Sequence, residues 1–84
     1  GLANKCVPLA EFDETVKSLA QRLAKGPTRA YGLMKELMNA AVVSDLETTL
    51  HLEGELQDQA VATSDHREGV MAFIQKRPAE FTGQ

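Results

Sequence analysis

The amino-acid sequence predicts an all-α protein with four helices, at about residues 9–25, 28–41, 45–62 and 65–77, after a short extended stretch at residues 1–8. Three observations support this fold class. Apolar residues recur at the helical period in all four segments. Residues that favour helix ends or helix starts separate the segments. No second segment has the alternation of a β-strand, so the extended stretch has no strand to pair with.

The first helix, at residues 9–25, has one apolar side. Its early turns are acidic and its late turns are basic, which complements the helix dipole. The apolar side repeats at intervals of three and four residues and consists of Phe12, Val16, Leu19, Ala20 and Leu23. Gly26 and Pro27 are expected to end this helix, since glycine suits a left-handed cap and proline cannot continue the hydrogen-bond ladder.

The second helix, at residues 28–41, has a methionine-rich apolar side formed by Ala30, Leu33, Met34, Leu37, Met38 and Ala41. Such a side could line a ligand groove, but at this spacing it is more often part of a hydrophobic core. In the third helix, at residues 45–62, Ser44 and Glu47 have the spacing of a capping box. Glu53 projects close to the middle of the apolar side of this helix. We expect it to pair with a lysine or arginine of another helix, in preference to acting as a catalytic base.

The fourth helix, at residues 65–77, follows a threonine, and either Ser64 or Asp65 can cap it. Asp65 and Glu68 also have the capping-box spacing. Pro78 disfavours a helical conformation at the residue before it, so the helix is expected to end there and to leave an irregular tail.

Phe73 and Lys76 are three residues apart on the fourth helix and are therefore neighbours on its surface. A ring and an ammonium group in this arrangement could contact an adenine face and a phosphate together. The pattern also has a simpler explanation, in which Phe73 belongs to the apolar core and Lys76 complements the helix dipole. The residue pattern by itself favours the simpler explanation.

The composition argues against several classes of function. A formal net charge of −3 and a pI near 5.3 disfavour a nucleic-acid-binding module, which would have a basic face. The sequence has neither a run of about 18 apolar residues nor a signal peptide, so no membrane association is expected. The single cysteine, Cys6, fits a reducing compartment and is expected to be a buried bystander, so we expect a cytoplasmic protein. A first residue other than methionine suggests a fragment of a longer protein.

The sequence predicts no catalytic residue and no metal site, because it has no phosphate-binding loop, no metal-ligand spacing and no nucleophile beside a base. His51 and His66 are expected to be solvated surface residues. An acyl carrier protein is one alternative, since such carriers have four helices and attach phosphopantetheine to the serine of an Asp-Ser-Leu sequence. Here Asp45 follows Ser44, and the charge is mild for a carrier. A second alternative is an independent helical protein-interaction module without catalysis.

Five motifs follow one another in an order typical of one enzyme family. They are Gly-Leu-Ala-Asn-Lys-Cys-Val-Pro at 1–8, a helix ending in Gly-Pro at 20–27, Lys-x-x-x-Asn at 35–39, Leu52-Glu53, and Asp-x-x-Glu-Gly-x-x-Ala-Phe-x-x-Lys-Arg-x-x-x-Phe at 65–81. Over essentially all 84 residues, the chain thereby resembles the C-terminal helical region of the enoyl-CoA hydratase/isomerase (crotonase) family. Cys6 stands where that family usually has an aliphatic residue.

The resemblance implies that residues 1–84 are a single C-terminal helical oligomerisation domain of a crotonase-type fold, without its spiral ββα core. Such enzymes bind acyl-CoA thioesters and stabilise an enolate oxyanion with backbone N–H groups of that core. The oxyanion hole and the catalytic acids would then lie upstream of Gly1, so the chain alone is expected to be inactive. Coenzyme A is expected as part of the substrate, with no covalently bound cofactor.

The resemblance also implies roles for particular residues. In the family this helical region packs at the interface of a trimer or a dimer of trimers, where an aromatic residue and a lysine of the last helix reach the adenine nucleotide of CoA. By position these residues are Phe73 and Lys76, while Glu53 becomes a structural ion-pair candidate. The general character is closest to isomerases and hydratases of aromatic-acid or fatty-acid degradation, but the segment does not distinguish one reaction from the other.

Overall fold

The structure, a computed structural model that describes residues 1–84, consists of four α-helices and contains no β-strand. Helix α1 spans Phe12–Ala24, α2 spans Thr28–Ala41, α3 spans Leu46–Val61 and α4 spans Ser64–Gln75, and a 3-10 turn, η1 (Leu9–Glu11), precedes α1. The predicted all-α fold with four helices is confirmed. The second helix has the predicted bounds, and the bounds of the other three differ from the prediction by one to three residues.

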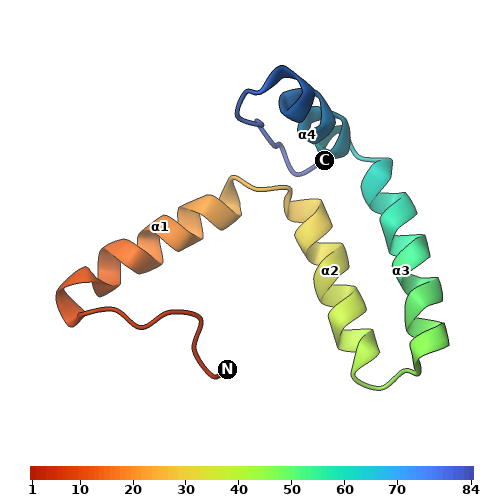
Figure 1. Ribbon diagram of the computed structural model, residues 1–84, viewed down its shortest axis with the longest axis horizontal. Coiled ribbons are helices and arrows are strands. Elements are labelled where there is room, and N and C mark those ends of the chain that lie inside the picture. The colour runs from red at the N-terminus through yellow and green to blue at the C-terminus, as the bar shows by residue number, and fades with distance from the viewer.

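Helices α2 and α3 form an antiparallel hairpin, drawn in yellow and green in Figure 1. Helix α4 lies at the end of this hairpin, beside the start of α2 and the end of α3, whereas α1 projects away from it (Figure 1). The arrangement is open. The radius of gyration is 16.1 Å, whereas a compact domain of this length has a radius of gyration of about 12 Å.

The hydrophobic core is small and is shared by α2, α3 and α4. Only three apolar side chains are buried, namely Leu33 of α2, Leu56 of α3 and Ala72 of α4. The accessible surface is 7126 Å², whereas a compact protein of this mass exposes roughly 4,900 Å². The chain therefore exposes roughly 2,200 Å² of surface that a compact protein of its mass would bury.

The predicted apolar side of α1 is not covered by another helix. Phe12, Val16, Leu19 and Leu23 are 41–52% exposed, and α1 contains no buried residue. An amphipathic helix is stabilised mainly by packing of its apolar face. Helix α1 therefore has the sequence of a packed helix but no packing partner within this chain.

The turn between α1 and α2 lies at Gly26 and Pro27, as predicted, but the reason for the glycine differs. Gly26 is not left-handed, since Gly83 alone among the glycines has a positive φ. Gly26 is instead buried against the ring of Tyr31, where a Cβ atom would lie 2.7 Å from Cε2 of that ring. A larger residue would therefore force Tyr31 or the turn to move.

The N-terminal caps of α3 and α4 each differ from the prediction. Asp45 caps α3 in place of Ser44, because the N–H of Thr48 donates to its Oδ1 at 2.7 Å, and this hydrogen bond lowers the pKa of Asp45. Thr63 caps α4, and its Oγ1 accepts a hydrogen bond from the N–H of His66 at 3.1 Å. Both caps have an extended backbone, which lets the side chain fold back onto the first turn.

Candidate functional site at α4 and the C-terminal tail

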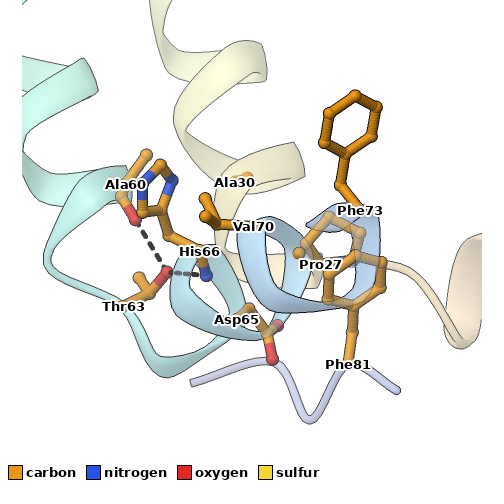
Figure 2. A pocket seen from close by; sticks show the side chains of 10 residues that line it. Pro27, Ala30, Ala60, Thr63, Asp65, His66, Val70, Phe73 and Phe81 are labelled. Carbon is orange, nitrogen blue, oxygen red and sulfur yellow. Dashed lines mark hydrogen bonds between the residues drawn. The ribbon is translucent and has the colours of Figure 1, made fainter. Parts of the chain in front are cut away.

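A groove of about 400 Å³ lies where α4 meets the hairpin of α2 and α3 (Figure 2). The start of α2, the end of α3, α4 and the C-terminal tail (residues 76–84) all contribute to it, and most of the lining is apolar or small. The lining residues are Pro27, Ala30, Ala60, Thr63, Asp65, His66, Gly69, Val70, Phe73 and Phe81.

Phe73, one of the two predicted ligand-binding residues, lies at the edge of this groove. Its side chain is 85% exposed, and Figure 2 shows its ring projecting away from α4. The explanation of Phe73 as a core residue is therefore wrong within this chain. An aromatic ring exposed to this extent offers a face on which a planar group can stack.

Lys76, the other predicted residue, lies just beyond the end of α4, and the prediction that the helix continues to Arg77 is wrong. Lys76 has a left-handed backbone (φ 53°, ψ 37°). Its N–H donates to the Phe73 carbonyl at 3.2 Å, and the N–H of Arg77 donates to the Ala72 carbonyl at 3.0 Å. These two bonds form a Schellman motif, which ends the helix before proline can.

The structure thus places Phe73 and Lys76 close together in the terminal turn of α4, as the sequence predicts. They are not neighbours on the surface of a regular helix, however. Lys76 is outside the regular helix, so its left-handed backbone determines where its side chain starts. The side chain of Lys76 is exposed and makes no hydrogen bond or ion pair. Its ammonium group is therefore free to bind an anion.

Asp65 anchors the C-terminal tail, a role that the sequence did not indicate. It was predicted to cap α4, but it lies inside the helix and is only 3% exposed. Its Oδ1 accepts the N–H of Thr82 at 2.7 Å and the Thr82 hydroxyl at 3.3 Å, and its Oδ2 accepts the N–H of Gly83 at 2.8 Å. Three donors thus satisfy a buried carboxylate that has no cation beside it.

Further contacts hold the end of the tail. Ser64, the other predicted cap of α4, donates from its hydroxyl to the Gln84 carbonyl at 2.6 Å. Gly83 has a φ of +80°, and a Cβ atom at this position would lie 2.5 Å from Oγ1 of Thr28 at the start of α2. Glycine is therefore required here both by its backbone and by the close approach of α2.

Glu68 and Arg77 form the single ion pair of the structure, and it joins α4 to the tail. The contact is bidentate, with Arg77 Nη2 at 2.8 Å from Glu68 Oε2 and Nη1 on Oε1. The Glu80 N–H also donates to Glu68 Oε1 at 2.8 Å. The Arg77 side chain and then the Glu80 N–H lower the pKa of Glu68 to about 2, and Glu68 in turn raises the pKa of Arg77.

The Glu68–Arg77 pair is expected to make the stability of the tail depend on pH. Because folding lowers the pKa of Glu68 from 4.5 to about 2, its contribution is fully present above pH 4.5 and is lost as the pH falls towards 2. We expect Glu68→Gln to speed amide exchange at Glu80 at neutral pH. The exchange rates of the Glu80 amide in the wild type and in the variant should converge near pH 2. A difference in exchange rate that persists unchanged at that pH would show that the Glu68–Arg77 pair is not the cause of the pH dependence.

The remaining candidate residues lie apart from this site. Cys6 is exposed, so its predicted burial is wrong, because no helix covers the N-terminal stretch. Glu53 is also exposed and makes no ion pair, so the predicted pairing with a lysine or arginine of another helix is absent from this chain. His51 and His66 are exposed, as predicted. No group of His, Cys, Asp or Glu side chains is placed to hold a metal ion, and no helix is long and apolar enough to cross a membrane.

Comparison with known proteins identifies the family of this chain. Residues 1–84 match the enoyl-CoA hydratase/isomerase family. The chain is 38% identical to a protein of Rhodobacter capsulatus named "Probable enoyl-CoA hydratase", over 100% of this chain and 33% of that protein. It is 44% identical to the 1,2-epoxyphenylacetyl-CoA isomerase of Escherichia coli, over 84% of this chain and 27% of that protein.

Solved structures show the same arrangement of helices. All of this chain superposes on 32% of an enoyl-CoA hydratase/isomerase family protein from Mycobacterium abscessus, with a TM-score of 0.94 and 34% identity. An enoyl-CoA hydratase from Geobacillus kaustophilus gives a TM-score of 0.88 at 32% identity, again over 100% of this chain and 32% of that one. The chain thus spans about a third of the length of the proteins that it matches, and its open arrangement of helices corresponds to a segment of their fold. It belongs to the enoyl-CoA hydratase/isomerase family.

Proposed function

We propose that this chain is the C-terminal helical region of an acyl-CoA hydratase or isomerase, where it contributes to subunit packing and to the site for the adenine nucleotide of CoA. The whole enzyme, a trimer or a dimer of trimers, would act on enoyl-CoA thioesters through an enolate oxyanion. The catalytic groups would come from the part of the family fold that this chain does not include. The observation that carries the proposal is the match of residues 1–84 to the family, and to about a third of the Rhodobacter capsulatus and Mycobacterium abscessus proteins.

The exposed surface supports this proposal over an independent interaction module. A self-sufficient bundle of this length would bury its apolar sides and approach a radius of gyration of about 12 Å. Here the apolar side of α1 is open, and the observed radius is 16.1 Å. The excess surface of roughly 2,200 Å² on this one chain is larger than the roughly 800 Å² that each partner buries in a standard protein interface.

The isolated chain is expected to self-associate through the apolar side of α1. Replacing both Val16 and Leu23 by aspartate should make it monomeric, because two carboxylates within an apolar contact would lose their hydration. Sedimentation velocity over a concentration series measures this change. Aspartates at Ser18 and Gln21, on the opposite side of α1, add the same charge and should leave the association intact. A wild-type chain that stays monomeric at every concentration would contradict the prediction.

The proposed CoA contacts are expected to be weak in this chain, because only the nucleotide end would be bound. We expect a CoA titration, followed by NMR, to shift the signals of Phe73 and Lys76 first. Phe73→Ala and Lys76→Ala should each weaken binding about five- to tenfold, through lost stacking and lost phosphate contact respectively.

The matched controls for this titration are Met38→Ala and Lys35→Ala, which remove an exposed large apolar side chain and an exposed ammonium group elsewhere. Both controls should bind CoA as the wild type does. The same samples should show no hydration of crotonyl-CoA above background. Turnover by this chain, or shifts spread evenly over all four helices, would overturn the proposed function.

A further inference from the structure

The two adjacent cations at the end of α4 differ in what their side chains do. Arg77 uses four of its five N–H donors: besides its bidentate contact with Glu68, its Nε donates to Gln75 Oε1 at 2.8 Å and its Nη1 donates to the Pro78 carbonyl at 3.0 Å. Lys76 makes no side-chain contact of this kind. The charge of Arg77 is therefore compensated by Glu68, and Lys76 is the uncompensated cation of this turn.

Lys76 also has an unusual backbone. It is the only residue other than glycine with a positive φ. Glycine normally occupies this position of a Schellman motif, because it has no Cβ atom to crowd the preceding carbonyl. A lysine in this conformation is strained relative to glycine, and such strain persists where the surrounding structure enforces it. The motif itself would form more easily with glycine, so it does not explain the presence of a lysine.

The contacts of Glu68 can hold the strained backbone of Lys76 in place. Glu68 lies on α4 about two turns before Lys76, and it holds both the Arg77 side chain and the Glu80 N–H. The chain is thereby fixed on the C-terminal side of Lys76, while α4 and the Phe73 carbonyl, which accepts the N–H of Lys76, fix it on the N-terminal side. A long side chain keeps many rotamers, so a fixed starting direction is what limits the positions that its ammonium group can reach.

We propose that the Glu68–Arg77 ion pair is a positioning device for Lys76: it holds the left-handed turn from which the lysine side chain leaves α4 and so presents the ammonium group to a phosphate of the bound nucleotide. The inference rests on the proposed function, in which Lys76 binds the nucleotide end of CoA. In this role Glu68 and Arg77 do not touch the ligand. Glu68 also neutralises Arg77, so Arg77 does not compete with Lys76 for the phosphate.

The test compares Glu68→Gln and Arg77→Lys with the wild type. The first removes the charge of the carboxylate, and the second cannot make a bidentate contact. The backbone readout is the pair of three-bond couplings from the amide proton of Lys76 to its Hα and to its carbonyl carbon, which together report φ. Both variants should lose the couplings of a left-handed residue at Lys76, while the amide signals of α2 and α3 stay unchanged and show that the fold is intact.

The binding readout uses CoA and adenosine as probes, since adenosine has the ring but no phosphate. Glu68→Gln is expected to weaken CoA binding about five- to tenfold, as Lys76→Ala does, and to leave adenosine binding unchanged. In the Lys76→Ala background, Glu68→Gln should have no further effect, because the group that it positions is already absent. Asp58→Asn is the matched control, since it removes an exposed carboxylate charge of α3 that lies outside the groove and makes no side-chain hydrogen bond, and it should keep CoA affinity.

The outcomes separate this inference from the proposed function. If Lys76→Ala weakens CoA binding and Glu68→Gln does not, the positioning role is wrong and the proposed site stands. Additive losses in the double variant would also overturn the positioning role, as would an unchanged φ at Lys76 in the Glu68→Gln chain. If the wild type shows no phosphate-dependent binding of CoA, the proposed nucleotide site fails, and the positioning role fails with it.

Discussion

Replacing Leu56 by alanine is expected to destabilise the chain by about 2–4 kcal/mol, the usual cost of removing a buried leucine side chain. Leu56 is 4% exposed and is one of only three buried apolar residues. A chain with so small a core has little stability to lose, so we expect the α2–α3 hairpin to open in a large fraction of the variant molecules. Urea unfolding followed by far-UV circular dichroism measures the change in the free energy of unfolding.

Leu50→Ala provides the matched control, because Leu50 is on the same helix but is 55% exposed. The two substitutions change helix propensity equally, so they differ only in the packing that is lost. We expect Leu50→Ala to change the free energy of unfolding by less than about 0.5 kcal/mol. Equal effects of the two substitutions would show that the hairpin is not held by the core between α2 and α3.

Asp65→Ala is expected to release the C-terminal tail from α4, at a cost of about 1–3 kcal/mol for the loss of a buried acceptor. The N–H groups of Thr82 and Gly83 both lose their partner. Their hydrogen exchange should therefore accelerate by a factor of roughly 5 to 150. The amides of α2 and α3 should exchange at nearly the wild-type rate, because the hairpin core does not involve the tail.

Two variants distinguish the possible reasons for such a change. Asp58→Ala removes an exposed carboxylate of α3 that makes no hydrogen bond through its side chain, and it should leave the tail protected. Asp65→Asn keeps one acceptor oxygen and should give an intermediate rate. If Asp65→Asn behaves as the wild type does, the charge of Asp65 is not needed. If the tail amides of Asp65→Ala also exchange at the wild-type rate, then Asp65 does not hold the tail.

Much of the local structure could be predicted because it depends on nearby residues. The period of the apolar residues predicted the number and order of the helices, and the second helix has the predicted bounds. The errors occurred where two neighbouring residues could serve the same purpose. Asp45 caps α3 where Ser44 was predicted, since the choice depends on which residue adopts an extended backbone.

The errors in the site have a different cause. Asp65 and Glu68 were explained by the helix that contains them, whereas their partners lie 9 to 18 residues away in the tail. No periodicity links an irregular tail to a helix, so no pattern in the sequence indicated these contacts. Glu53 and Cys6 were expected to be paired or buried on the assumption that each apolar side is covered, and in this chain it is not.

The sequence by itself determined the all-α class, the four helices and the family, because helix formation depends on neighbours and family motifs depend on residue order. It also indicated Phe73 and Lys76 as the residues for a CoA contact, which stays a prediction. Only the tertiary structure decided that α1 lacks a partner, that Asp65 holds the tail, and that Glu68 pairs with Arg77 beside the turn at Lys76. These features depend on contacts between residues distant in the chain and on the surface that the fold leaves uncovered. A local pattern of residues predicts neither of them.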